Sequence, residues 1–336
     1  MSPVVANPAF VSTPVAPPRQ PVLDAARGLA ILAMVSFHAT WDLAYFGFIP
    51  ADFPDRPWFR LYGHMIASSF LTLVGVGLVL AFRKADPWPR YWQRITKIAI
   101  AASLITLVTH AIMPDAFIFF GILHCIVLCS LVGVLFVRAS LGVRLGTMAV
   151  AFALPLWIAS PALDAPAFWW LGLGTHLPVS NDIQPFLPWF GMVMAGMVLA
   201  ESNFAQRFGA VWAQRLRPTR LRAGLAGAGR HSLGLYMLHQ PLLFAILYPL
   251  TLALGPAAPP DSHTLVGQCE IQCVNSGRDA PACHRGCTCF ADQIKQHGLW
   301  DKAQLGRLNA VEQKSIIGFA NQCVRAQDVP ETLGND

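Results

Sequence analysis

The first long apolar stretch of the chain, residues 24–44, carries four polar side chains that share one helix face: Asp24, Arg27, His38 and Asp42. At about 100° per residue, Arg27 and His38 fall within about 20° of each other and about 16 Å apart along the helix axis. Charged groups inside a span are costly and usually face a cavity or one another. The pattern predicts proton-transfer chemistry, with His38 as a base that Asp42 orients. Asp24 and Arg27 form either an anion-binding pair or an ion pair at the start of the helix.

His124 and His239 lie inside later apolar stretches. A helix bundle can collect them with His38 into one polar cavity, and both are therefore catalytic candidates. The alternative is that each imidazole only caps a neighbouring carbonyl group. Asn181 and Asp182 lie where the chain enters the sixth apolar stretch from outside, and they either contact a substrate or cap a helix.

The composition indicates that the helices carrying these residues cross a membrane. Hydrophobic residues make up 54% of the 336 residues and charged residues only 12%, about half the share in a soluble domain. Apolar runs of about 20 residues recur without the alternation of barrel strands. Because backbone groups must be satisfied inside lipid, we predict an all-α bundle of about seven spans. The predicted spans are about 24–44, 58–82, 95–113, 117–137, 145–160, 185–201 and 231–255.

Lysine and arginine residues gather in three connecting segments, 83–97, 138–144 and 202–230, whereas 161–184 contains none. Cationic residues favour the cytoplasmic side of a membrane, which puts the N-terminus inside and, with seven spans, the C-terminus outside. The net charge of +6 arises from these segments and does not indicate nucleic-acid binding. Residues 204–217 mix aromatic and arginine side chains, which predicts a helix on the inner membrane surface.

The composition also divides the chain into three parts. Residues 1–22 are rich in Pro, Ala and Val and predict a disordered cytoplasmic tail. Residues 23–256 form the membrane domain. Residues 261–336 are polar and cysteine-rich, which predicts a small helical module on the outer side. Its last helix is expected to begin with a capping box formed by Asn309 and Glu312.

Six of the eight cysteines lie in this module: Cys269, Cys273, Cys283, Cys287, Cys289 and Cys323. Two pairs are spaced i, i+4, so that each pair lies on one helix face. Two antiparallel helices could be joined by Cys269–Cys287 and Cys273–Cys283, leaving Cys289–Cys323, although six cysteines allow 15 pairings. The other interpretation is a zinc site that includes His284. An outer location favours disulfides, which compensate for a small core, and we expect no resident metal.

Several motifs together resemble a known family. Leu23-Asp24-Ala-Ala-Arg27-Gly28, with His38 fourteen positions after Asp24, is similar to the first-helix motif of transmembrane acyltransferases. Three further motifs follow in order: Phe119-Phe120-Gly121-Ile122-Leu123-His124, Asn181-Asp182 with Pro188-Trp189, and His231-Ser232-Leu233 with His239-Gln240-Pro241. Over residues 22–248 the chain resembles the family of the catalytic domain of heparan-alpha-glucosaminide N-acetyltransferase. The resemblance does not extend to residues 261–336.

The resemblance implies an enzyme without a bound cofactor that takes an acyl group, expected to be acetyl, from cytoplasmic acyl-CoA. The acceptor is expected on the far side as a sugar or another hydroxyl or amine compound. Arg27 and Asp24 are implied to contact the donor, with Arg27 paired to a phosphate, while His38 takes a proton from the acceptor. In the heparan enzyme the catalytic histidine lies after the first helix, where His64 is the nearest residue. Those relatives have more spans, so either a smaller core suffices, or the chain pairs with a second copy, or it has lost activity.

Two other functions would use the same features. A transporter could use the polar stripe as a proton path, but it is expected to show inverted repeats and broken helices, and only Pro241 suggests a break. A non-catalytic scaffold could present the cysteine-rich module to an external partner, but it would not need several polar groups inside the membrane. The sequence has no P-loop, HExxH or GxSxG motif, which excludes the enzyme classes that depend on them.

Overall fold

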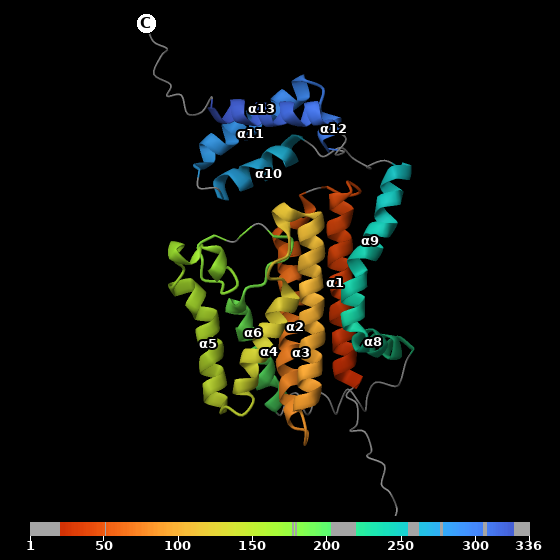
Figure 1. Cartoon of the computed structure of the whole chain (residues 1–336), viewed down its shortest axis with the longest axis vertical. Helices are drawn as coiled ribbons and strands as arrows, with labels where there is room; N and C mark the ends of the chain where they lie inside the picture. The colour runs from red at the N-terminus through yellow and green to blue at the C-terminus, as the bar shows by residue number, and fades with distance from the viewer. Residues whose placement is uncertain are drawn as a thin grey trace, which may run out of the picture.

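The computed structural model describes residues 21–50, 52–176, 178, 180–202, 220–254, 262–275, 278–304 and 308–325. These residues form helices and connecting turns, and none of them belongs to a strand, although an isolated parallel bridge joins Phe120 and Ile183. Figure 1 shows a bundle of upright helices with a further group of helices beyond one end. Most of the predicted tail 1–22, and all of the predicted surface helix 204–217, lie outside the described residues.

Each predicted span corresponds to an apolar helix among the described residues. Four of these helices are long and apolar enough to cross a membrane: α1 (Pro21–Tyr45), α2 (Pro57–Phe82), α3 (Trp88–Ile112) and α9 (Ser232–Leu254). Three are shorter: α4 (Ile122–Gly133) with its 3₁₀ extension η3 (Val134–Phe136), α5 (Leu141–Trp157) and α6 (Phe186–Glu201). The chain is therefore an all-α integral membrane protein, in which length and composition identify four spans, while the count of seven stays a prediction.

The two ends of the bundle differ in charge. At one end α1 begins, α2 turns into α3 and α4 turns into α5, and Lys84, Arg90 and Arg138 lie there; we call it the basic end. At the opposite end the connections contain the 3₁₀ turns η1 (Phe53–Asp55), η2 (Pro114–Ala116), η4 (Pro161–Leu163) and η5 (Pro166–Phe168). Helices α1 to α6 therefore run alternately away from and toward the basic end.

The core of the bundle forms where α2 packs against α6 and α4. Val193 and Met197 are fully buried there. The backbones of α2 and α6 touch, because a Cβ atom on Gly75 would overlap the Val193 carbonyl oxygen and one on Gly196 would overlap that of Thr72. Small residues permit this close approach in a membrane, where dispersion contacts drive helix association.

The prediction that residues 138–144 form a connecting loop is wrong at its C-terminal end. Arg144 lies inside α5 and is buried. Its Nε and Nη2 atoms donate hydrogen bonds to the carbonyl oxygens of Phe136 (2.9 Å) and Val137 (2.6 Å). Its Nη1 atom pairs with Glu201 at 2.7 Å. The side chain therefore joins the ends of α4, α5 and α6, which satisfies a cation that would otherwise be costly to bury.

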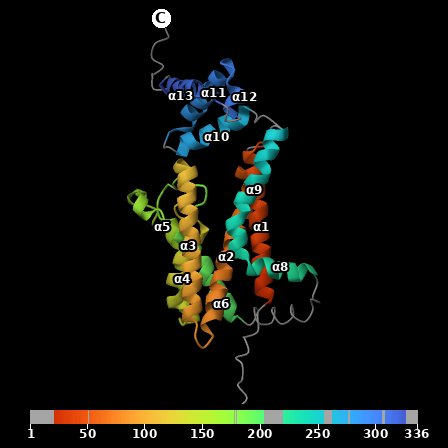
Figure 2. The ribbon, with the colours of Figure 1, turned by 45° about the vertical axis from the view of Figure 1, so that its right-hand side comes forward.

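A second group of helices stands beside the core. α1 packs against α9 and against α8 (Arg220–Arg230), which lies crosswise at the basic end in Figures 1 and 2. A Cβ atom on Gly28 would overlap the Leu225 carbonyl oxygen, and one on Gly229 would overlap that of Asp24. The backbones of α1 and α8 therefore touch, which fixes α8 at the level of the first turns of α1.

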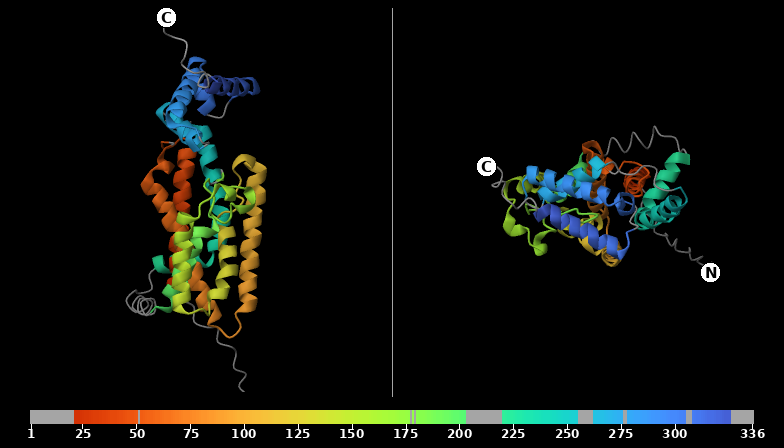
Figure 3. Two further views of the ribbon diagram at one scale, coloured as in Figure 1. Left: turned by 90° about the vertical axis from the view of Figure 1, so that its left-hand side faces the viewer. Right: turned by 90° about the horizontal axis from the view of Figure 1, so that it is seen from above.

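The described residues of the C-terminal module form four helices: α10 (Ser262–Asn275), α11 (Ala280–Gln296), α12 (Trp300–Gln304) and α13 (Ala310–Arg325). In Figure 3 they lie beyond the end of the bundle that is opposite the basic end. Asn309 and Glu312 form the predicted capping box, since each side chain accepts a hydrogen bond of 2.9 Å from the backbone N–H of the other.

Three disulfides hold the module together. They join Cys269 to Cys287, Cys273 to Cys283 and Cys289 to Cys323, the pairs that the helical spacing suggested. The alternative zinc site is wrong, because all six sulfur atoms are in disulfides and none is available as a thiolate ligand.

Candidate functional site

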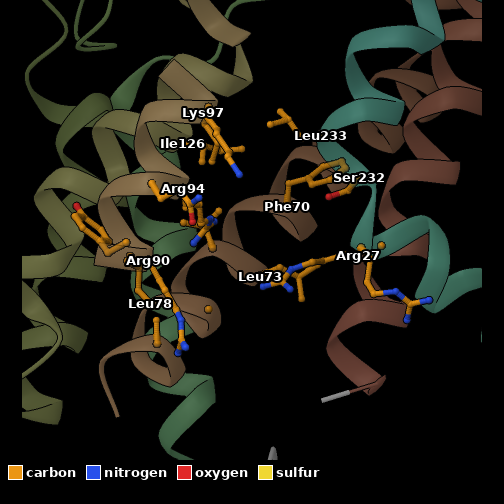
Figure 4. A pocket seen from close by; sticks show the side chains of 18 of the residues that line it. Arg27, Phe70, Leu73, Leu78, Arg90, Arg94, Lys97, Ile126, Ser232 and Leu233 are labelled. Carbon is orange, nitrogen blue, oxygen red and sulfur yellow. The ribbon is translucent and has the colours of Figure 1, made fainter. Parts of the chain in front are cut away.

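A cavity of about 610 Å³ lies at the basic end, between the core helices and the second group of helices. Residues of α1, α2, α3, α4, α8 and α9 line it. Figure 4 shows Arg27 entering from α1 and Arg90, Arg94 and Lys97 entering from α3, with apolar side chains of α2 between them. The volume is in the range of cavities that enclose a small-molecule ligand.

The cavity is strongly cationic. Two carboxylates line it, Asp24 and Asp86, against six basic side chains: Arg27, Lys84, Arg90, Arg94, Lys97 and Arg230. Apolar side chains such as Ile31, Phe70 and Leu233 form much of the remaining wall. Charges of one sign in a cleft with low-dielectric walls concentrate ions of the opposite sign. The cavity therefore suits a ligand with an anionic head and a less polar remainder.

Arg27 and Arg94 converge on one point of the cavity wall. A Cβ atom on Gly77 of α2 would lie 3.3 Å from Arg27 Nη2 and 3.8 Å from Arg94 Nη1. Asp24 Oδ1 pairs with Arg27 at 3.5 Å, but no carboxylate among the described residues forms an ion pair with Arg94. Two like charges held together inside a membrane protein are unfavourable unless an anion compensates them. The two guanidinium groups therefore indicate a site for an anionic group such as phosphate, because a guanidinium group can donate two parallel hydrogen bonds to phosphate oxygens.

His38 of α1 and His239 of α9 meet farther along their helices, with ring centroids 4.8 Å apart. His239 Nδ1 is hydrogen-bonded to the backbone carbonyl oxygen of Tyr236, and because a carbonyl only accepts, Nδ1 carries the hydrogen. Nε2 of the neutral ring then keeps its lone pair, and this atom is buried without a hydrogen-bond partner among the described residues. His64, the alternative base, packs its ring 5.9 Å from that of Trp189 instead. His239 therefore has a buried ring nitrogen that is free to accept a hydrogen bond.

Asp42 belongs to the same cluster. The sequence suggested a hydrogen bond between Asp42 and His38, but in the structure Asp42 is hydrogen-bonded to Gln240 instead. Gln240 Nε2 donates to Asp42 Oδ1 at 2.7 Å, which links α9 to α1. Asp42 is fully buried. Asp42 Oδ2 and Gln240 Oε1 have no hydrogen-bond partner within the described part of the chain. With His239 Nε2 these atoms make three buried, unsatisfied acceptors, which indicates a ligand that brings N–H or O–H donors.

Tyr236 connects the cavity to the histidine pair. Its side chain lines the cavity, and its carbonyl oxygen holds the ring of His239. Along α1, Arg27 and His38 are separated by about 16 Å. An elongated ligand with its anionic end at Arg27 can therefore extend past Tyr236 toward His38 and His239.

His124 and Asp182 lie at the start of α4, whereas Asn181 contacts Met113 and Ala116 in the connection between α3 and α4. Among the described residues, none of the three makes a hydrogen bond or ring contact with the histidine pair. His124 Nδ1 accepts a hydrogen bond of 3.3 Å from the Gly121 N–H, and Asp182 Oδ2 accepts one of 2.9 Å from the Ile122 N–H. The first N–H groups of a helix need such acceptors because they have no partner within the helix. These contacts favour capping roles for His124 and Asp182. The catalytic role of His124 and the substrate-binding roles of Asn181 and Asp182 stay predictions.

Several cavity residues were not identified as site residues from the sequence. Arg90 and Arg94 were predicted to lie in a loop, because the third span was expected to begin at residue 95, whereas α3 begins at Trp88. Their spacing with Lys97, at i, i+4 and i+7, is the spacing of one helix face and is the signal that could have found them. Gln240 carries no such signal, because the residue that it contacts is 198 positions away.

This region matches the model of a known protein family. The family model described as heparan-alpha-glucosaminide N-acetyltransferase, catalytic, matches residues 19–241. The matched segment contains the cationic cavity and the histidine pair, and it ends before the C-terminal module. None of the curated proteins and none of the solved structures matches the chain.

Proposed function

The chain belongs to the heparan-alpha-glucosaminide N-acetyltransferase catalytic family, and we propose that it transfers an acyl group, expected to be acetyl, from acyl-CoA to an acceptor across the membrane. Membership indicates a membrane acyltransferase-like function. The donor, the acceptor and the residue that moves the proton are proposals, and each is supported by a feature of the described residues.

The proposed donor is acyl-CoA, with its phosphates in the cationic cavity. The observation that supports this proposal is the convergence of Arg27 and Arg94 over Gly77, where no carboxylate among the described residues forms an ion pair with Arg94. Arg90 and Lys97 extend the cationic surface along α3, which suits a ligand with several phosphate groups. The pantetheine arm of CoA is long and only moderately polar, and the apolar wall that leads to Tyr236 suits it.

The proposed base is His239, with His38 as its neighbour. An acceptor amine or hydroxyl donates a hydrogen bond to His239 Nε2, and its nitrogen or oxygen attacks the thioester carbonyl carbon. The proton moves to Nε2 as the carbon–sulfur bond breaks, and it then passes to the departing CoA thiolate. The products are the acylated acceptor and CoA. Asp42 and Gln240 accept hydrogen bonds from the remaining donors of the acceptor, which favours a sugar or a similar polyfunctional molecule.

We propose that the basic end faces the cytoplasm, because lysine and arginine gather at that end. The C-terminal module then lies on the extracytoplasmic side. Its three disulfides support this orientation, since disulfides persist in oxidising compartments. The donor and acceptor thus reach the histidine pair from opposite sides of the membrane.

Proteoliposomes test this function directly. The chain is reconstituted and the orientation of each preparation is scored by protease access to the C-terminal module. Radiolabelled acetyl-CoA is supplied on the basic side, with glucosamine or N-acetylglucosamine on the other side as amine and hydroxyl acceptors. We expect label on an acceptor only when the donor is on the basic side, and empty liposomes as the control should show none. Absence of labelled acceptor in both orientations would contradict the proposal.

A further inference from the structure

Helix α8 has an uncovered surface, and of its exposed residues only Arg230 also lines the cationic cavity. Ala226 and Gly229 are buried where α8 meets α1, whereas Leu221 is 74% exposed. Arg220 and Arg230, at the two ends of the helix, are exposed as well. Figures 1 and 2 both show α8 extending sideways from α1 at the basic end, away from the core helices.

The side chains of α8 divide into an apolar and a basic flank. At about 100° per residue, Leu221, Leu225 and Ala228 fall within an arc of about 60°. Arg230 lies about 180° from Leu221 and Arg220 about 100° from it. An apolar arc opposite basic residues is typical of helices that lie in the plane of a membrane interface.

The contact with α1 sets the depth of α8 in the membrane. The backbone of α8 touches α1 at Asp24 and Gly28, which lie in the first two turns of a helix whose membrane-spanning part begins at Val22. The first turns of a span lie among the lipid head groups. Because the contact allows no side chain at Gly28 or Gly229, α8 cannot sit much deeper or shallower than this level.

We propose that α8 is a docking surface for the anionic phospholipids of the leaflet at the basic end. Leu221 and Leu225 enter the acyl-chain region, and Arg220 and Arg230 contact the head-group phosphates. The choice of an anionic lipid follows from charge, because α8 carries arginines at positions 220, 222 and 230 and no acidic residue. Arg230 and Gly229 also line the cationic cavity, so that the bound lipid contacts the helix that forms the cavity rim.

A fluorescence experiment on the full chain tests this docking surface. Leu221→Cys is labelled with bimane, since the two free cysteines, Cys125 and Cys129, are buried and the other six are in disulfides. The labelled protein is reconstituted in phosphatidylcholine vesicles that contain phosphatidylglycerol, with bromine on the chains of one lipid or the other at equal mole fraction. Brominated phosphatidylglycerol should quench the label more strongly than brominated phosphatidylcholine.

The matched variants assign this preference to α8. Arg220→Gln should lower the quenching ratio toward one, by up to about fivefold, the change expected for one basic residue at an anionic surface. Arg220→Lys keeps the charge and should therefore leave the quenching ratio unchanged. Arg138 is an exposed arginine at the basic end outside α8, and Arg138→Gln should also leave the ratio unchanged. The proposal would be overturned if both brominated lipids quenched the label equally or if neither quenched it. It would also be overturned if Arg138→Gln lowered the quenching ratio as much as Arg220→Gln. No acyl donor is present, so the result does not depend on the proposed acyltransferase activity.

Discussion

Replacing Arg94 with glutamine is expected to weaken donor binding without destabilising the protein. Arg94 Nη1 and Arg27 Nη2 lie 3.8 and 3.3 Å from the same point above Gly77, so these nitrogens are at most about 7 Å apart. With an effective dielectric constant of about 20, two charges about 7 Å apart repel each other by about 2 kcal/mol, and a shorter separation would increase the repulsion. Arg94→Gln removes this repulsion from the ligand-free protein, and its Tm should therefore stay the same or rise.

In the complex with CoA the same substitution removes a charge-assisted contact to phosphate, which contributes about 1.5–3 kcal/mol. The Kd for CoA should therefore rise by about 10- to 100-fold. Isothermal titration calorimetry on protein in lipid nanodiscs measures the Kd, and thermal unfolding of the same samples gives the Tm.

Two further variants complete this test. Gly77→Leu fills the point between the guanidinium groups without removing a charge and should also raise the Kd. Arg138→Gln removes a charge at the basic end outside the cavity and should change neither quantity. An unchanged Kd in Arg94→Gln, or a Tm lowered by several degrees, would refute the assignment of Arg94 to the donor site.

Three other predictions concern the packing and the outer segments. Gly229→Val places a side chain where α8 touches α1 and should lower the free energy of unfolding by about 1–3 kcal/mol, measured by denaturant unfolding in detergent. Cys323→Ser opens the disulfide to Cys289, whose sequence separation of 34 residues predicts a loss of about 4 kcal/mol in the module, measured by its rate of proteolysis. Hydrogen bonds, chiefly from the Thr175 hydroxyl, lower the pKa of Asp164 from 3.8 to about 2, so its stabilising effect is present above pH 3.8 and lost as the pH falls toward 2. The Tm difference between the native chain and Asp164→Asn should follow that pH course.

Each of these predictions has a result that contradicts it. A Cβ atom added to Gly224 would meet no other atom within 4 Å, so Gly224→Val is the control for Gly229→Val. Equal effects of the two substitutions would show that helix propensity rather than contact with α1 is responsible. If the module of the Cys323→Ser variant resisted protease as well as that of the native chain, the stability of its helices would not depend on that disulfide. A Tm difference for Asp164→Asn that persists at pH 2 would mean that the carboxylate is not the stabilising form.

Relations within one helix could be predicted from the sequence. The shared face of Asp24, Arg27, His38 and Asp42 follows from the helical repeat alone, and in the structure the first two line the cavity while the last two lie in the histidine cluster. The spacing of Cys269 with Cys273, and of Cys283 with Cys287, placed each of these pairs on one face of one helix. That placement suggested which cysteines could join two helices, but six cysteines allow 15 pairings, and only the structure gives the three disulfides.

Relations between helices could not be predicted in this way. Asp42 contacts Gln240 because α1 packs against α9, and Arg27 and Arg94 converge because α1 and α3 line the same cavity. Periodicity gives the face of each helix but not which faces meet, and a chain of seven apolar helices allows many arrangements. The proposed cluster of three histidines shows the limit, since His239 joins His38 whereas His124 holds the start of α4.

The central claim is that the histidine pair moves the proton during acyl transfer, and a single-turnover measurement tests it most directly. Reconstituted protein is loaded with radiolabelled acetyl-CoA, and label transfer to the acceptor is followed in His239→Ala and in His110→Ala, an exposed histidine on α3 outside the site. General-base catalysis contributes about 10²- to 10⁴-fold, so we expect His239→Ala to slow transfer by at least about 100-fold at unchanged CoA affinity. His110→Ala should transfer label at the native rate. Transfer by His239→Ala at the rate of His110→Ala would contradict the claim.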